Sequence, residues 1–277
     1  MPLAPSHPWV NSAPFNTNKT YLYAVMGASN AIGSMLYDDA NDPEQNQYNN
    51  TLFEKKISHL DVLSNFSTPV NNSNTSNYNL LNEDGAYGYT TRLSARLREY
   101  VRDTVCGVSG GESATPLTVG SGWYASRNSS NPFDTSTRYG QMVSRIQNAQ
   151  NITGAQCQFI VTNMAGRDAA LNVLSSFWHS QYLALASDVR TDLSNPNLVF
   201  VNIGLGPTPS NAATNYPTWD DIIAVQNTLG SENNMININP VVDLGYSLAN
   251  HVQNDEVHYN TEGYNGIADE IVARLFE

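Results

Sequence analysis

The sequence predicts an α/β fold, with a doubly wound, mainly parallel five-stranded sheet that has helices on both faces. Five short apolar runs recur along the chain, and they are continuously apolar rather than alternating. Strands of this kind are expected where helices cover both faces of a sheet. Segments of helical period separate the runs, and an alternation of strands and helices favours a parallel sheet.

The apolar runs and the helical segments set the expected order of elements. The expected strands are 21–26, 104–108, 157–162, 198–203 and 235–242. The expected helices are 88–103, 136–150, 168–188, 217–229 and 262–276. The last helix has the clearest pattern, because Ile267, Ile271 and Leu275 fall four residues apart and Thr261 is placed to cap its N-terminus.

The length of 277 residues suits one α/β domain with extended loops. We expect a polar N-terminal arm at 1–20 and a single domain at 21–277. Residues 37–82 interrupt the alternation with an Asn-rich tract, so a long surface excursion with room for one short strand is expected there. No internal repeat is visible.

Composition argues against several classes of partner. The chain has 25 acidic and 13 basic residues, a formal charge of −12 and a pI near 4.7. An acidic surface without a Lys/Arg cluster repels polyanions, so neither nucleic acid nor an anionic membrane is expected as a partner. No run of about 18 apolar residues is present to span a bilayer. The oligomeric state stays open.

No metal or other cofactor is expected either. The acidic cluster at 38–44 lacks the glycine and the alternating ligand spacing of an EF-hand calcium loop, so it is interpreted as a solvated turn. The N-terminus lacks the basic-then-apolar layout of a secretory signal. Several Asn-x-Ser/Thr triplets still favour an extracellular setting.

Cys106 and Cys157 each lie near the start of an expected strand. If those two strands are neighbours, a disulfide is conceivable. The favoured interpretation is a pair of buried thiols, because cysteine behaves as a small hydrophobic residue in protein cores.

Two distant segments carry the residues of an acyl-transfer site. The run at 21–26 stops at a turn that places Ser29 between glycines, directly after a buried strand. At the other end of the chain, Asp255 and His258 lie three residues apart, just before the last helix. A serine hydroxyl needs an imidazole to take its proton, and that imidazole needs a carboxylate on its other nitrogen. Alone, His258 would be interpreted as a helix cap and Asp255 as a turn residue; together with the serine turn they indicate a serine esterase.

An esterase also needs donors for the oxyanion of its tetrahedral intermediate. The backbone N–H groups of Ser29 and Gly111 and an amide from the Asn163 segment are the candidates. All of them follow expected strands, and the ligand crevice of an open α/β sheet lies beyond the carboxyl ends of its strands.

These motifs resemble those of the SGNH hydrolases, in particular the branch of sialate O-acetylesterases, acetyl xylan esterases of carbohydrate esterase family 6 and phage tailspike deacetylases. Residues 27–30 resemble the family's Gly-Gln-Ser-Asn block, and 110–113 with Trp123 resemble its glycine pair followed by tryptophan. Residues 219–226 resemble the helix before the last strand, and 255–263 the Asp-x-x-His block with its trailing glycine. The resemblance runs from about residue 21 to the C-terminus and implies an SGNH/flavodoxin-like three-layer sandwich.

Two positions depart from the family pattern. Ala28 replaces the glutamine of the nucleophile block, and the usual Gln-Gly-Glu-x-Asp block has become 163–168. An ungapped match puts Met164 at the place of an oxyanion amide, whereas a one-residue insertion puts Asn163 there. Asn163 is preferred because methionine cannot donate a hydrogen bond. Arg167 either reaches the substrate or pairs with Asp168.

The resemblance implies a metal-independent carbohydrate O-acetylesterase whose partner is an acetylated carbohydrate. Ser29 is then the nucleophile, His258 the base and Asp255 its orienting carboxylate, and Arg167 and Trp123 are candidate substrate-binding residues. Two alternatives remain: a glycan-binding or virion attachment module that has lost the chemistry, and a lipid- or thioester-directed hydrolase of the same fold. The aromatic residues that are either sugar-stacking faces or ordinary core residues are Trp123, Tyr124, Tyr139 and Trp219.

Overall fold

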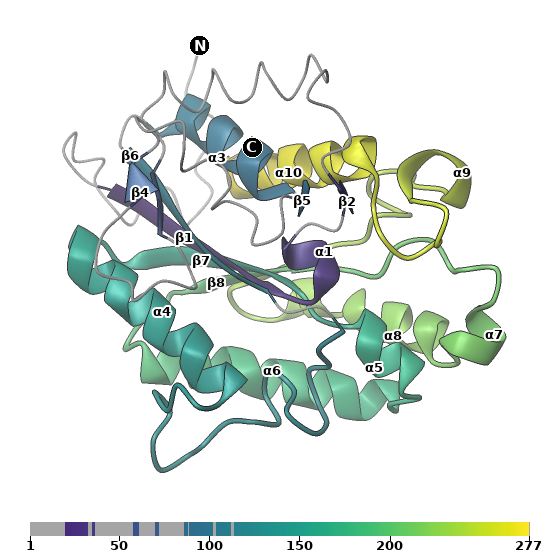
Figure 1. The fold of residues 1–277 in the computed structure, drawn as a ribbon, viewed down its shortest axis with the longest axis horizontal. Helices are drawn as coiled ribbons and strands as arrows, with labels where there is room; N and C mark the ends of the chain where they lie inside the picture. Colours follow the sequence, from purple (N-terminus) through teal and green to yellow (C-terminus); the bar gives the residue numbers. More distant parts are fainter. Residues whose placement is uncertain are drawn as a thin grey trace.

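A largely parallel β-sheet with helices on both faces forms the centre of the protein (Figure 1). The structure is a computed structural model, and it describes residues 20–32, 35–36, 58–60, 70–71, 86–87, 89–101, 104–111 and 114–276. The strand order in the described sheet is β4-β3-β6-β1-β7-β8-β9. The five central strands are parallel: β6 (Thr104–Gly111), β1 (Thr20–Gly27), β7 (Cys157–Asn163), β8 (Val199–Ile203) and β9 (Met235–Ile238).

The five strands predicted from the apolar runs are these five central strands, so the predicted fold class is confirmed. The last one is shorter than expected, ending at Ile238 rather than 242. The Asn239 side chain accepts hydrogen bonds from the N–H groups of Val241 and Val242, and these bonds close a turn where an extended strand was expected.

Within the described ranges, four short strands accompany the five central ones: two extend the sheet at one edge, and two form a separate pair. At the β6 edge, β3 (Ser58–Leu60) pairs parallel with β6, and β4 (Val70–Asn71) pairs antiparallel with β3. A separate antiparallel pair consists of β2 (Met35–Leu36) and β5 (Ala86–Tyr87). β3 and β4 belong to the predicted excursion, so this part of the chain contributes more than the single strand that was expected.

Helices flank the sheet much as the sequence predicts. The described helices are α1 (Ser29–Ile32), α3 (Tyr89–Tyr100), α4 (Arg138–Thr153), α5 (Gly166–Ala170), α6 (Ser175–Asp192), α7 (Ala212–Asn215), α8 (Trp219–Gln226), the 3-10 turn η2 (Leu229–Ser231), α9 (Leu248–His251) and α10 (Thr261–Phe276). The helix expected at 168–188 is two helices, α5 and α6. Asn172 between them has a φ of 54°, a left-handed conformation that ends a helix and that asparagine tolerates.

The first turn of α10 has a different cap from the one predicted. The Asn260 side-chain oxygen accepts a hydrogen bond of 2.9 Å from the N–H of Gly263. Asn260 therefore caps this helix from the position directly before it, and Thr261 is its first residue.

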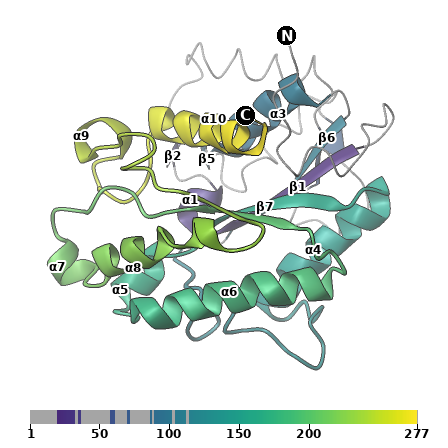
Figure 2. The same cartoon turned by 180° about the vertical axis from the view of Figure 1, so that it is seen from behind.

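Each face of the sheet has its own apolar core. Leu22 and Ala24 of β1 pack in a cluster with residues of α4, α6 and α8. Tyr23 and Val25 point to the other face, into a cluster with residues of α3 and α10. Figures 1 and 2 show α3 and α10 on one side of the sheet and α4, α6 and α8 on the other. This alternation along residues 22–26, which are all buried, is the three-layer arrangement that the sequence predicts.

Some sequence predictions fall outside the described residues. The N-terminal arm lies there except for Thr20, and so does most of the excursion at 37–82, including the acidic cluster at 38–44. The division into one arm and one domain stays a prediction. Among the described residues, no helix combines the length and the apolar character that crossing a membrane requires.

The strand registers bear on the two cysteines. Leu22 of β1 is level with Cys106 of β6 on one side and with Cys157 of β7 on the other. β1 therefore lies between them, and two interstrand spacings of about 4.8 Å separate the cysteine backbones by roughly 10 Å. A disulfide requires Cα atoms within about 7 Å, so this register does not allow one. Cys157 is buried, and its thiol donates to the carbonyl of Phe159.

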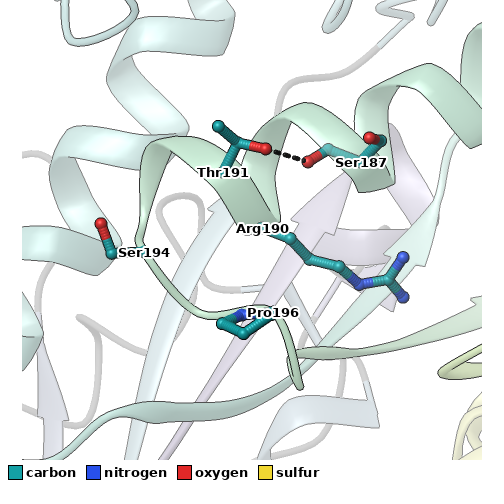
Figure 3. Close-up of a pocket in the computed structure, with 5 residues that line it drawn as sticks. All are labelled: Ser187, Arg190, Thr191, Ser194 and Pro196. Atoms are coloured by element: carbon teal, nitrogen blue, oxygen red, sulfur yellow. Dashed lines mark hydrogen bonds between the residues drawn. The ribbon is translucent and has the colours of Figure 1, made fainter.

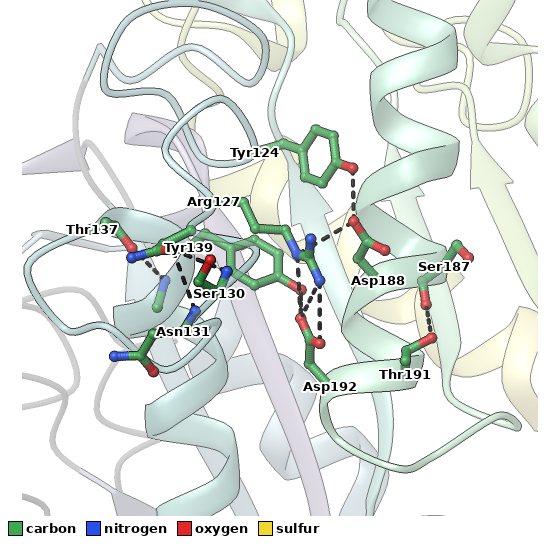
Figure 4. A network of polar contacts seen from close by, with 12 residues as sticks. Tyr124, Arg127, Ser130, Asn131, Thr137, Tyr139, Ser187, Asp188, Thr191 and Asp192 are labelled. Atoms are coloured by element: carbon green, nitrogen blue, oxygen red, sulfur yellow. Dashed lines mark hydrogen bonds and ion pairs between the residues drawn. The ribbon is translucent and has the colours of Figure 1, made fainter.

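The loop that follows β6 is held against α6 by a network of polar contacts (Figure 4). Arg127 lies between two carboxylates of α6, 3.3 Å from Asp188 and 3.2 Å from Asp192. The hydroxyls of Tyr124 and Tyr139 donate to the same two carboxylates, at 2.7 and 2.5 Å. Burial, together with the hydrogen bond to Asp188, raises the pKa of Tyr124 to about 12, so its hydroxyl remains a donor at neutral pH.

The same loop is tied to α5 by a fully buried carboxylate. Asp168 accepts hydrogen bonds from the N–H of Leu117 at 2.7 Å, and from the N–H and hydroxyl of Thr118 at 3.1 and 2.7 Å. Burial raises the pKa of Asp168 above its ordinary value, although these hydrogen bonds act in the opposite direction. Arg167, for which pairing with Asp168 was one of two alternatives, is exposed, and the donors to the Asp168 carboxylate come from the loop.

Asp168→Asn is expected to destabilise the protein. The asparagine would turn an N–H₂ group toward the N–H of Leu117 or of Thr118, leaving a buried donor without an acceptor at a cost of about 1–3 kcal/mol. Urea unfolding at pH 7 measures the loss. Thr118→Val, which removes only the hydroxyl donor, is the milder control, and equal unfolding midpoints for wild type and Asp168→Asn would contradict the assigned role.

Candidate active site

The turn that carries Ser29 begins where β1 ends. Gly27 has a φ of 149°, and a Cβ at this position would lie 2.3 Å from the Asn163 carbonyl oxygen. The next residue, Ala28, donates its N–H to that same oxygen at 2.9 Å. Only glycine permits this close approach of β1 to β7, and α1 then starts at Ser29. The side chain of Ser29 lies outside the part of the chain that the structure describes.

Three strands end at the same level beside this turn. Gly27 is level with Gly111 of β6 and with Asn163 of β7. The predicted oxyanion residues Gly111 and Asn163 therefore flank the position two residues before Ser29. This convergence follows from the parallel sheet, because the carboxyl ends of parallel strands meet at one edge.

Asp255 and His258 lie in a closed loop before α10. Residues 253–258, which we call the histidine loop, are bounded by a β-bridge between Val252 and Tyr259. Inside the bridge, the N–H of Gln253 donates to the His258 carbonyl at 2.7 Å. The loop thus has a defined backbone on both sides of the histidine.

The predicted pairing of Asp255 with His258 is present. The Nδ1 atom of His258 is 2.5 Å from one Asp255 carboxylate oxygen, and the other oxygen accepts the N–H groups of Val257 and His258 at 3.0 Å. Burial raises the pKa of Asp255, but the hydrogen bonds from His258 and Val257 outweigh it and hold the pKa below its ordinary value. The ionised Asp255 carboxylate therefore holds Nδ1 of the His258 ring, whose side chain is 26% exposed, and Nε2 is the other nitrogen of that ring.

A second carboxylate in the histidine loop, that of Glu256, anchors the loop to a neighbouring segment. Glu256 has a φ of 62°, a left-handed conformation that is uncommon for a residue with a side chain. Its carboxylate accepts hydrogen bonds from the hydroxyl and the N–H of Ser210, both at 2.6 Å, and these bonds lower its pKa. The loop after β8 therefore fixes the strained corner of the histidine loop.

Asn30 connects the histidine loop to the serine turn. Its side-chain amide donates to the carbonyl of Val257 at 3.2 Å, and its side-chain oxygen accepts the N–H of Tyr259 at 3.2 Å. These two backbone groups belong to the residues on either side of His258. The sequence hypothesis requires the serine turn and the histidine loop to lie together. Asn30, the residue after Ser29, contacts both neighbours of the candidate base His258.

Of the two candidates for the third oxyanion donor, Asn163 ends β7 level with Gly27, and Met164 follows it. The buried Asn163 side chain donates one N–H to the Ile203 carbonyl at 3.2 Å, which leaves its second N–H for another acceptor. Met164 is fully buried in the apolar core, and its carbonyl accepts the indole N–H of Trp178.

The candidate substrate-binding residues differ in exposure. Arg167 is exposed on α5, and it has no ion pair with a carboxylate in the part of the chain that the structure describes. Trp123 is only 2% exposed and packs in the core, so the structure corrects its prediction as a sugar-binding face. Tyr139 and Trp219 are buried as well, and partly buried Tyr124 packs on the same core. Trp123 and Tyr124 lie in the loop that is held against α6, whereas Tyr139 belongs to α4 and Trp219 to α8.

Sequence reasoning missed Asn30 and the pair of Glu256 with Ser210 as parts of this site. Asn30 stands beside Ser29 in the motif, but its partners lie 227 to 234 positions further along the chain. No local pattern reports a contact of that range.

A hollow of about 400 Å³ lies away from this site (Figure 3). It is lined by Ser187, Arg190, Thr191, Ser194 and Pro196. These residues lie at the end of α6 and before β8, so the hollow is at the amino edge of the sheet. Among the described residues, no group of three or more His, Cys, Asp or Glu side chains is placed to hold a metal ion.

Comparisons with known proteins show the fold. No family model matches the chain, and no curated protein matches it by sequence. A solved protein from Arabidopsis thaliana superposes with a TM-score of 0.67 at 14% identity, covering 92% of this chain and 97% of that one. A lipase from a goat rumen metagenome gives a TM-score of 0.55 at 13% identity, covering 92% and 98%.

A carbohydrate acetylesterase from Xanthomonas citri gives a TM-score of 0.57 at 10% identity, covering 92% of this chain and 56% of that one. The chain therefore matches little more than half of that esterase. At these identities the likeness concerns the fold alone. The chain has an α/β fold that a solved lipase and a solved carbohydrate acetylesterase also have.

Proposed function

We propose that this protein is a serine esterase that removes O-acetyl groups from a carbohydrate. The observation that carries the proposal is the Asp255–His258 pair, held by Asn30 next to the Ser29 turn at the carboxyl edge of the sheet. An oriented imidazole beside a serine turn is the arrangement that activates a hydroxyl for acyl transfer. The solved carbohydrate acetylesterase with this fold supports the choice of substrate class.

In the proposed reaction, the Ser29 oxygen attacks the acetyl carbonyl carbon while its proton passes to Nε2 of His258. The carbonyl π electrons move to oxygen, and the N–H groups of Ser29 and Gly111 and the amide of Asn163 donate to this oxyanion. As the intermediate collapses, the bond to the sugar oxygen breaks and that oxygen takes the proton from His258. The products of this first half are the free sugar hydroxyl and an acetyl ester on Ser29.

Water completes the reaction. His258 takes a proton from water as the water oxygen attacks the acetyl-enzyme, and the proton returns to the Ser29 oxygen as acetate leaves. Asp255 remains ionised throughout and stabilises the imidazolium that forms twice. Its pKa below the ordinary value suits this role. Exposed Arg167 is proposed as a contact for polar groups of the carbohydrate.

Lipase activity is the second candidate function, because a solved lipase has the same fold. The length of the preferred acyl chain separates the two functions. We expect kcat/KM for p-nitrophenyl acetate to exceed that for p-nitrophenyl octanoate by about 100-fold, because an acetyl pocket excludes a long chain sterically. Acetate release from acetylated xylan, sialosides and bacterial surface polysaccharides then identifies the carbohydrate. Faster turnover of octanoate favours the lipase, and no turnover of any ester favours a glycan-binding module.

A further inference from the structure

The side chain of Asn30 makes three hydrogen bonds, all with the segment around the candidate base. Its amide nitrogen donates to the carbonyl of Val257, and its oxygen accepts the N–H of Tyr259 and, at 2.9 Å, the hydroxyl of Tyr264. Asn30 is 9% exposed, and Tyr259 and Tyr264 are buried. The contacts therefore form in a site largely shielded from water, where few other partners compete for these groups.

The chemistry of these contacts requires an amide. The Val257 carbonyl can only accept and the Tyr259 N–H can only donate, so the side chain between them must offer one donor and one acceptor. This requirement also fixes which end of the Asn30 amide is oxygen. Aspartate at this position would face the Val257 carbonyl with a second acceptor, and an aliphatic residue would leave both backbone groups unsatisfied.

The hydrogen bonds of Asn30 restrain the backbone on both sides of His258. The two backbone groups that it holds come directly before and after His258, so the backbone of His258 cannot move away from the serine turn without breaking one of them. Asn30 is also joined to Ser29 by a peptide bond. One side chain thereby sets the distance between two segments that meet only through the fold.

We propose that Asn30 is a positioning residue that holds the His258 imidazole in reach of the Ser29 hydroxyl. This inference rests on the proposed esterase function. Misplacement of a reacting group by about 1 Å typically costs about 100-fold in rate. Loss of the Asn30 bonds is thus expected to slow proton transfer and leave substrate binding nearly unchanged.

The test compares Asn30→Asp with a matched control, Asn195→Asp. Asn195 is also buried and donates its amide to a backbone carbonyl, that of Cys157, at the opposite edge of the sheet. With p-nitrophenyl acetate, Asn30→Asp is expected to lower kcat by about 100-fold with KM within about twofold. Asn195→Asp is expected to keep the wild-type kcat per folded molecule, with both folded fractions measured by circular dichroism. The rate of Ser29 labelling by a fluorophosphonate is expected to fall in parallel with kcat.

A second variant covers the case in which Asn30→Asp does not fold. Tyr264→Phe removes only the hydroxyl that donates to the Asn30 oxygen, and it is expected to lower kcat by about threefold to tenfold with KM unchanged. If folded Asn30→Asp keeps the wild-type kcat and labelling rate, the positioning role is overturned and the esterase function stands. If Asn30→Asp is unfolded, the same result in Tyr264→Phe leads to the same conclusion. A wild-type protein that neither turns over esters nor reacts with the fluorophosphonate would overturn both.

Discussion

Ser29→Ala is expected to lower kcat for acetyl esters by about 10⁴- to 10⁶-fold while the protein stays folded. Without the hydroxyl, His258 has no nucleophile to activate, and only the oxyanion donors and substrate binding remain to favour hydrolysis. Continuous hydrolysis of p-nitrophenyl acetate by wild type and variant measures the loss. Ser180→Ala is a suitable control, because the exposed Ser180 hydroxyl donates only to a carbonyl of its own helix, α6.

The same variant separates an enzyme from a binding module. Rapid quenching of the wild-type reaction and mass spectrometry are expected to find one acetyl group on the peptide that contains Ser29, and none in the variant. Activity of Ser29→Ala within tenfold of wild type would rule out Ser29 as the nucleophile. Turnover by neither protein would leave glycan binding as the function to measure.

Asp255→Asn is expected to lower kcat by about 10⁴-fold. The asparagine oxygen can still accept the N–H groups of Val257 and His258, but its N–H₂ group then faces Nδ1 of the imidazole. A donor at that place favours the ring with its proton on Nε2, which then cannot accept the Ser29 proton. Steady-state kinetics at pH 8 measure the effect. Glu256→Gln changes a neighbouring carboxylate in the same loop and is expected to have a much smaller effect, because it bonds to Ser210 and not to the imidazole.

The same substitution changes the pH dependence of stability. The folded pKa of Asp255 lies below its ordinary value of 3.8, so the ionised carboxylate stabilises the folded state above that value. This contribution is lost as the pH falls through the lower folded pKa. Thermal unfolding between pH 2 and 5 (roughly the range of carboxyl titration) is therefore expected to show a weaker pH dependence for Asp255→Asn. Identical pH profiles of the two proteins would show that the hydrogen bonds do not lower this pKa.

The central strands and most helices are predictable because their signals are local. The run ending at Met26 is apolar on consecutive residues, and the structure buries both of its faces. The repeat of Ile267, Ile271 and Leu275 likewise forms the buried face of α10. Element ends are less predictable, because single side chains decide them. Asn239 ends β9 early, and Asn172 divides the helix expected at 168–188.

Of the candidate site, the sequence alone indicated the candidate groups: a serine after a buried strand, and an aspartate three residues before a histidine. The pairing of that aspartate with the histidine needs no more than one turn of chain. Only the tertiary structure decided what holds these segments together and which residues line the site. Asn30 reaches across more than 220 positions to Val257 and Tyr259, and Glu256 takes its partner from the loop after β8. Trp123 is buried because its loop packs on the core beside α6. Contacts of this range depend on how the strands are ordered in the sheet, and that order is set by packing of the whole core rather than by any neighbouring residues.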